Sequence, residues 1–308
     1  MATTTSITTT YAGEKLQGFI SAALLSANTI ENGGVTVKPN VKFKAVIKSL
    51  ATGTLIADDT CDFTDSSSVT LAERILQPET FQVNLQLCKD DFRSDWDAIS
   101  MGYSAFDSLP PSFADYLVGH VAAKVAEEME TTIWMGTNAT AGQFDGFTTL
   151  FAADSDVIDV TGTSVDSSNV IAEMGKVVDA IPSAIYGKED LKLYVSKNIM
   201  KAYVRALGGF GASGLGAAGT DNKGTQWYDN GALSFDGVSV FMAAGLGDNR
   251  MVAAQSSNLY FGTGVLSDLN QVKVLDMADL DGSQNVRVIA RFTGGIQYGF
   301  GAEIVYYT

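Results

Sequence analysis

Two runs of alternating side chains, at 35–48 and 80–87, frame a long stretch that is rich in turn residues. Apolar residues occupy every second position of each run, which is the period of a half-buried β-strand. The pattern predicts a two-stranded excursion that leaves the body of the protein near residue 40 and returns near residue 90. A hairpin of this size has no core of its own, so it must lie on another surface. No other segment of the chain is obviously spare to receive it.

The first run has a cationic outer face, and the stretch after it is acidic. The lysines are Lys38, Lys42, Lys44 and Lys48, and the acids are Asp58, Asp59, Asp62 and Asp65. Lysines along an outer strand discourage unwanted strand pairing, and this protection alone would explain them. The alternative is that the lysines contact acidic residues of a neighbouring molecule.

The net charge of −15 is concentrated in the middle of the chain. Residues 1–50 carry +3, residues 51–187 carry −17, and residues 188–308 carry −1. A positive arm joined to a negative body favours self-assembly, because the arm can lie on the body of another copy. The charge alone is equally compatible with an acidic soluble protein. It argues against a nucleic-acid binder, since affinity for duplexes comes mainly from cations that neutralise phosphates.

Length and composition indicate a folded protein of two lobes, or of one lobe with large excursions. The mean hydropathy of +0.11 and the 46% of hydrophobic residues exclude a disordered chain. Apolar runs are too short to cross a bilayer, and the Ser/Thr-rich stretch 1–10 does not resemble a secretion signal. Cys61 and Cys88 are too few for a disulfide framework, so two reduced thiols are expected.

The clearest helix is predicted between Pro110 and Met135, before Gly136. Its apolar residues recur at every fourth position, namely Phe113, Leu117, Val121, Val125, Met129 and Ile133. Its acids are expected on the solvent side, namely Glu127, Glu128 and Glu130. About 25 residues at 1.5 Å each give a rod of roughly 38 Å.

The remaining pattern mixes helices and strands. Helices are predicted at 11–26, 169–181 and 197–207, and a glycine tract spans 208–224. Strands are predicted at 191–195, 238–244, 251–254, 259–262 and 272–276, and two more in a strongly β-like end at 286–307.

A search for catalytic or metal-binding motifs finds none that convinces. The only histidine, His120, lies on the predicted long helix, which removes most histidine-dependent triads and every multi-histidine metal site. Gly209, Gly211 and Gly214 match a dinucleotide-binding spacing, but no strand precedes them. The acidic segment that ends at Gly282 lacks the spacing of an EF-hand. We therefore expect no cofactor, no metal and no enzymatic activity.

The order of these elements, with several short stretches of sequence, carries a family resemblance. The stretches are Tyr11 to Lys15, Leu24 to Thr29, Phe81 to Leu85, Ser112 to Asp115, Phe144 to Phe147 and Ile185 to Leu191. Over nearly its whole length the chain resembles the major capsid protein of tailed bacteriophages, which has the Hong Kong 97-like fold also seen in encapsulins. The motifs reflect architecture and not chemistry, so the resemblance depends mainly on their order along the chain.

The resemblance implies an α+β chain with the Hong Kong 97-like capsid fold. Its parts would be an N-terminal arm (1–34), an extended β-hairpin loop (35–98), a peripheral domain (99–179) with a spine helix (110–135), an axial domain (180–270), and a return through the peripheral domain to a C-terminal strand (271–308). The glycine tract would form the loop at the capsomer centre, with Gly208, Gly209, Gly211, Gly214, Gly216 and Gly219. Some members cross-link a lysine of the extended loop to an asparagine, but no local motif around Lys48 or Asn285 matches.

The resulting hypothesis is a virion capsid protein, made in the bacterial host cytoplasm, that assembles into hexamers and pentamers around double-stranded DNA. Expected partners are other copies of the chain, with separate scaffold, portal and decoration proteins as further candidates. We expect no sequence-specific DNA binding and no membrane. The four lysines and four aspartates named above are the predicted contacts between subunits. Two alternatives stay open, an encapsulin-type shell with protein cargo and a two-lobed carboxylate-dependent hydrolase.

Overall fold

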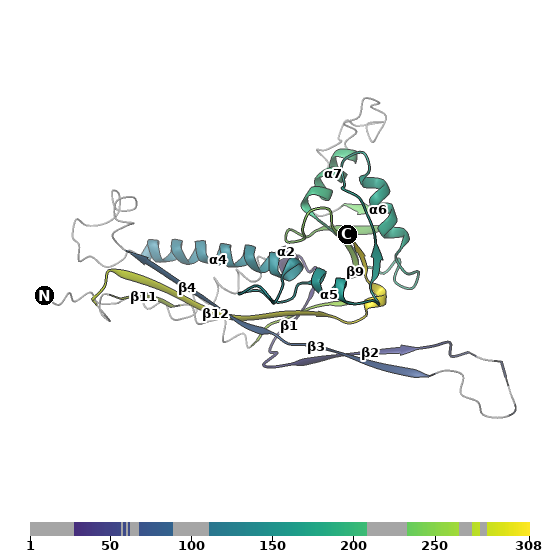
Figure 1. Cartoon of the computed structure of the whole chain (residues 1–308), viewed down its shortest axis with the longest axis horizontal. Coiled ribbons are helices and arrows are strands. Elements are labelled where there is room, and N and C mark those ends of the chain that lie inside the picture. The colour runs from purple at the N-terminus through teal and green to yellow at the C-terminus, as the bar shows by residue number, and fades with distance from the viewer. Residues whose placement is uncertain are drawn as a thin grey trace.

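A computed structural model describes residues 28–56, 58–59, 61, 68–88, 111–207, 233–264, 273–277 and 282–308. Figure 1 shows a long plate of strands under a long helix, a second lobe of strands and helices, and a hairpin that projects from the plate. The predicted helix 11–26 and the glycine tract lie outside the described residues, as do Asp62 and Asp65.

The plate is a five-stranded sheet within the described part of the chain. It contains β1 (Thr36–Lys38), β4 (Glu79–Cys88), β10 (Leu259–Gly262), β11 (Lys273–Asp276) and β12 (Asn285–Tyr298). The central strand β12 is 14 residues long and pairs in antiparallel fashion with β4, β10 and β11, while β1 joins β10 in parallel. The alternation predicted for β12 is confirmed, since Val286, Val288, Ala290 and Phe292 are all buried.

The helix α4 (Pro111–Met135) lies along this sheet, as Figure 1 shows. Its predicted bounds are confirmed to within one residue. The helix begins at a proline, which suits the first turn, and Gly136 follows its last residue. Met129, Ile133 and Trp134 are buried in the core against the sheet. The short helices α2 (Asn28–Glu31) and α5 (Phe147–Ala153) pack beside the same core.

Glu130 of α4 is buried, so its expected place on the solvent side is wrong. Its two carboxylate oxygens accept hydrogen bonds from the backbone N–H of Thr29 at 3.0 Å and from the Thr29 hydroxyl at 2.5 Å. The indole N–H of Trp134 donates to the same hydroxyl at 2.7 Å. A buried carboxylate is tolerated when hydrogen bonds replace its hydration. This network fixes α2 to the C-terminal half of α4.

The second lobe is built on a sheet that has six strands among the described residues. Its order is β5 (Ile158–Val160), β13 (Val305–Tyr307), β9 (Met251–Gln255), β6 (Leu191–Val195), β8 (Val238–Met242) and β7 (Ser234–Phe235). Helices α6 (Val170–Asp179) and α7 (Lys197–Leu207) pack on one face of this sheet. The 3₁₀ turn η4 (Gly301–Glu303) interrupts the predicted β-like end between β12 and β13.

The two lobes share a core. Strand β9 is buried on both faces, with Met251 and Ala253 in the cluster under the helices and Val252 and Ala254 in the cluster under α4. Such two-sided burial explains its continuous apolar sequence.

No helix in the described chain is long and apolar enough to cross a membrane. Cys61 and Cys88 are free thiols, as expected.

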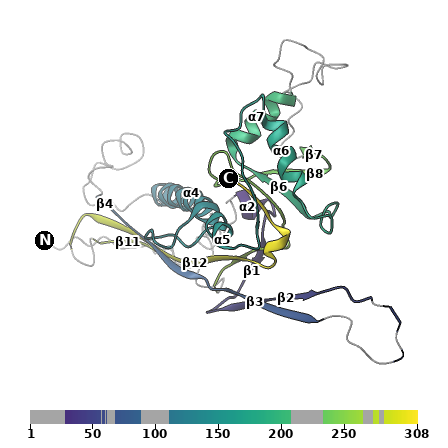
Figure 2. The same ribbon diagram turned by 45° about the vertical axis from the view of Figure 1, so that its right-hand side comes forward.

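The hairpin consists of β2 (Ala45–Thr52) and β3 (Val69–Leu76), which pair with each other in antiparallel fashion. The turned view in Figure 2 also shows it projecting from the plate. It is shorter than the sequence predicts. The single strand expected from Val35 to Lys48 is wrong, because strand geometry stops at Pro39 and Asn40. The φ of Asn40 is +63°, which is incompatible with an extended strand.

The predicted return strand of the excursion, 80–87, belongs to the body. It forms most of β4, which pairs with β12 over ten residue positions. Pro78 separates it from β3, and a proline lacks the N–H that a continuing ladder needs. The projecting element therefore begins near Ala45 and ends near Leu76.

Candidate assembly interface

The outer face of the hairpin is apolar and exposed. Directly opposed residues of an antiparallel pair lie on the same face, and here Val46 faces Ile75, and Leu50 faces Leu71. All four side chains are exposed, as is Val69 at the far end of β3. Exposed apolar side chains that gather on one face of a folded protein indicate a binding surface.

One ion pair interrupts this face. Lys48 lies opposite Glu73, with Nζ and Oε1 4.0 Å apart and both side chains exposed. Exposed pairs of this kind contribute about 0–1 kcal/mol, because water screens them and both side chains lose freedom. The pair therefore makes this face more polar but contributes little to the stability of the hairpin.

The inner face of the hairpin is held against the body near its root. Ile47, Ser49 and Leu76 are buried. Leu76 packs so closely on Gly262 of β10 that a Cβ at Gly262 would lie 2.8 Å from its Cδ2 atom. The Gln297 side chain donates a hydrogen bond to the Ile75 carbonyl at 3.1 Å. Near its root the hairpin thus has one face fixed by its own chain and one face open.

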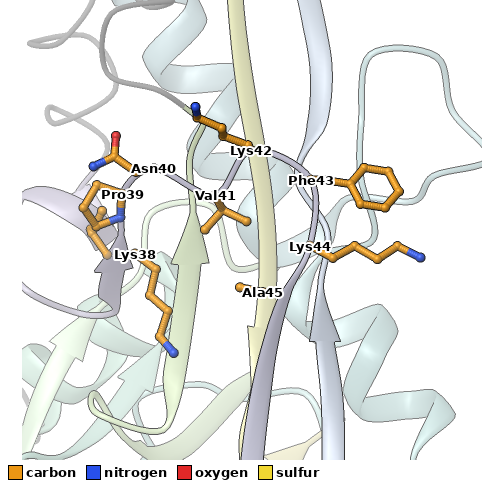
Figure 3. Close-up of a pocket in the computed structure, with 9 residues that line it drawn as sticks. Lys38, Pro39, Asn40, Val41, Lys42, Phe43, Lys44 and Ala45 are labelled. Atoms are coloured by element: carbon orange, nitrogen blue, oxygen red, sulfur yellow. The ribbon is translucent and has the colours of Figure 1, made fainter.

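Three further lysines lie on the segment from the end of β1 to the start of β2. Figure 3 shows Lys38, Lys42 and Lys44, which line a shallow hollow together with Phe43, pointing in different directions. Phe43 is 71% exposed. Val41 is buried, and its N–H donates to the Thr263 carbonyl at 3.0 Å. The segment is therefore anchored at Val41 and exposes Lys42, Phe43 and Lys44 after this anchor.

The structure separates the lysines predicted from the sequence. The Nζ of Lys38 lies 4.3 Å from the centre of the Tyr260 ring, a cation–π contact within the body. Lys48 faces Glu73 of its own hairpin. Lys42 and Lys44 are exposed, and neither forms an ion pair with another residue of the described ranges. These two are the lysines best placed to meet an acidic neighbour.

The predicted acidic contacts are only partly described. Asp58 and Asp59 are exposed beyond the end of β2, and no ion pair inside the described chain brings them to any of the four lysines. The glycines proposed for the axial loop lie outside the described residues, and their role stays a prediction. The sequence analysis did not predict the apolar outer face, although Val46 and Leu50 stand two positions on either side of Lys48 and so share the face of that lysine.

Nothing in the described residues resembles a metal site, since no group of three or more histidine, cysteine or acidic side chains comes together there. His120 is exposed on α4. Of the segment ending at Gly282, Asp279 and Asp281 lie outside the described residues.

No protein-family model and no curated protein matches this chain. Solved structures do match it over most of its length. The capsid of a native GTA particle matches with a TM-score of 0.56 at 14% identity, over 92% of this chain and 90% of that one. The capsid of phage XM1 matches with a TM-score of 0.55 at 11% identity, over 91% of both chains. The chain has the fold of phage capsid proteins.

This capsid fold confirms the resemblance inferred from the sequence. A third match is the procapsid of satellite phage P4, with a TM-score of 0.53 at 9% identity, over 93% of this chain and 96% of that one. Identities of 9% to 14% mean that the likeness lies in the course of the backbone. The surface residues of this chain therefore differ from those of the matched structures, and any contact surface has to be identified from its own side chains.

Proposed function

We propose that this chain is the major capsid protein of a tailed phage, which closes into hexamers and pentamers of an icosahedral head around double-stranded DNA. The proposal includes the Hong Kong 97-like arrangement. In it the plate with α4 is the peripheral domain, the six-stranded lobe is the axial domain, and the hairpin is the extended loop. The role is structural rather than catalytic, in a virion whose subunits are made in the host cytoplasm.

The outer face of the hairpin is the observation that carries this function. A two-stranded sheet is marginally stable by itself, and this one presents apolar cross-strand pairs to water. Covering five half-exposed side chains would contribute about 1 kcal/mol each. A second copy of the chain is the proposed cover, because in a closed shell each subunit both gives a hairpin and receives one.

The cationic link supports the same arrangement. Lys42 and Lys44 are exposed on a protein whose net charge is −15, so acidic surface on a neighbouring copy is the most abundant counter-charge available. We propose that these lysines, with Lys38, Lys48 and the aspartates of 58–65, lie at or near the contact between subunits. Scaffold, portal and decoration proteins are further proposed partners.

Electron microscopy of the purified protein tests the proposal. Negative-stain images and light scattering should show closed particles of narrow size distribution. Particles recovered from the producing host should hold nuclease-protected double-stranded DNA. A compact monomer at every protein and salt concentration would contradict the capsid function and favour the two-lobed hydrolase. Particles filled with a protein cargo would instead favour an encapsulin-type shell.

A further inference from the structure

Arg74 joins the hairpin to the body at the root of β3. It lies on the inner face, opposite Ile47. Its Nη2 donates to Oδ2 of Asp154 at 2.5 Å, and its Nε donates to the Gly299 carbonyl at 3.1 Å. The guanidinium carbon also lies 4.2 Å from the centre of the Tyr298 ring. One side chain of the hairpin therefore makes three different contacts with the body.

The partners of Arg74 are themselves held in place. Asp154 caps the C-terminal end of α5, and its Oδ1 accepts the N–H of Asp156 at 3.0 Å. The hydroxyl of Tyr298 donates to Oδ2 of Asp154 at 2.6 Å, and Tyr298 is only 1% exposed. The side chains of Arg74 and Asp154 are 27% and 18% exposed. Charge-assisted hydrogen bonds in such partly buried places are stronger and more directional than surface ion pairs.

The hairpin is held near its root only, as far as the described residues show. Beyond Ser49 on β2 and Ala72 on β3, the described side chains are exposed. An eight-residue strand is about 26 Å long at 3.3 Å per residue. A rotation of about 10° at the root would then move the far end by roughly 4.5 Å, close to the spacing of neighbouring strands. Small errors in the angle would misplace the whole outer face.

We propose that Arg74, Asp154 and Tyr298 form a positioning clamp that sets the angle of the hairpin before assembly, and so sets the curvature of the shell. This inference rests on the proposed capsid function. The hairpin is then a preformed lever and not a segment that orders only when it meets its neighbour. The guanidinium suits this task, because its planar fork fixes direction through two donors while its face rests on the tyrosine ring.

Four substitutions test the clamp at different strengths. Arg74→Gln removes the charged guanidinium, and Asp154→Asn removes the carboxylate charge. Tyr298→Phe removes only the hydroxyl that donates to Asp154 and is the smallest of these changes. In the unassembled protein, hydrogen exchange of the hairpin amides in 45–52 and 69–76 should accelerate at least tenfold in the first two variants. Cryo-electron microscopy of assembled material should show mixed or shifted particle diameters. Arg74→Lys should fall between wild type and Arg74→Gln.

Glu173→Gln is the matched control. Glu173 lies in the second lobe, where its carboxylate accepts hydrogen bonds from the Tyr307 hydroxyl at 2.8 Å and from Lys176 at 2.8 Å and 2.9 Å. Glu173, Tyr307 and Lys176 thus form a similar group of carboxylate, tyrosine and cation at a site away from the hairpin. The control should lower the thermal midpoint while hairpin exchange and particle diameter stay at wild-type values.

The outcomes separate the clamp from the capsid function. Wild-type hairpin exchange and wild-type particle diameters in both Arg74→Gln and Asp154→Asn would overturn the clamp and leave the capsid function intact. Equal changes in the Glu173→Gln control would also overturn it, because the effect would then be one of general stability. If the wild type forms no particles, the capsid function fails. The shell-curvature role then fails with it, and hairpin exchange still decides whether the three residues fix the angle.

Discussion

Leu50 and Leu71 lie directly opposite each other on β2 and β3, and their side chains are 57% and 66% exposed. A leucine pair in this position contributes little to the monomer, but covering the exposed part of each side chain with a neighbour would contribute about 1 kcal/mol. We therefore expect Leu50→Asn with Leu71→Asn to lower particle yield at least tenfold in sedimentation. The free energy of unfolding of the monomer should change by less than about 1 kcal/mol.

Ile171→Asn provides the control for this pair. Ile171 is 53% exposed on α6, in the second lobe, so the substitution removes a similar apolar side chain from a different surface. Particle yield should be unchanged in the control. Equal yields from the control and the leucine variant would contradict the role of the outer hairpin face.

The exposed lysines of the linking segment give a second prediction. Changing Lys42 and Lys44 to Glu should impair assembly much more than monomer folding, because the reversed charges would meet an acidic neighbour. Light scattering at low and moderate salt measures the effect, which salt should reduce. Lys197→Glu with Lys201→Glu makes the same change of charge at exposed positions on α7. Normal shells from the Lys42 and Lys44 variant would rule out the proposed contact.

The sequence predicted elements whose signals are local. The helix α4 was found because its apolar period, its starting prolines and Gly136 all lie within one segment. The hairpin was predicted too long because apolar alternation continues through Pro39 and Asn40, although Asn40 has a positive φ that ends the strand. Hydrophobic period does not report such a change of backbone direction.

The partners of each strand were beyond local signals. Leu85 of β4 lies opposite Val288 of β12, and no pattern in either segment specifies the other. The same holds for the clamp, since Arg74 and Asp154 are 80 residues apart. For Glu130, charge suggested the solvent side, and only the fold reveals that Thr29 supplies its hydrogen bonds.

Gly245 and Gly175 should respond to alanine in opposite directions. A Cβ at Gly245 would lie 2.0 Å from the backbone carbonyl oxygen of Glu130, so Gly245→Ala must push the loop away from α4. We expect a loss of about 1–3 kcal/mol in unfolding free energy, as for other overpacked positions. Gly175 lies inside α6 with nothing within 4 Å of the added atom, so Gly175→Ala should gain about 0.5–1 kcal/mol. Urea unfolding of both variants measures the difference, and a gain at Gly245 would contradict the close contact.

Glu130→Ala should destabilise the monomer by about 2–4 kcal/mol. The substitution leaves the N–H of Thr29 buried without its acceptor and removes a hydrogen bond to a charged group. Glu128→Ala, on an exposed position of the same helix, should stay within about 0.5 kcal/mol of wild type. Chemical denaturation compares the two, and equal effects would mean that the buried network contributes little.

Acid should loosen the hairpin through Asp154. Burial alone would raise the pKa of this carboxyl, but hydrogen bonds from Tyr298, the Asp156 amide and Arg74 outweigh it and hold the pKa below its usual value. A carboxyl with a lowered pKa in the folded state stabilises the protein above its unfolded pKa of about 3.9, and this contribution is lost as the pH falls through the folded pKa. Pepsin cleavage within the hairpin should therefore increase below about pH 4, relative to cleavage elsewhere in the chain.

Glu173 also has a lowered pKa, mainly because Lys176 donates hydrogen bonds to it, so acid weakens the second lobe as well. The Asp154→Asn variant separates the two effects. At the highest pH at which pepsin is still active, its hairpin should be cleaved faster than the wild-type hairpin. As the pH falls further, cleavage of its hairpin relative to the rest of the chain should not increase again. A hairpin step that persists unchanged in Asp154→Asn would mean that another group controls it.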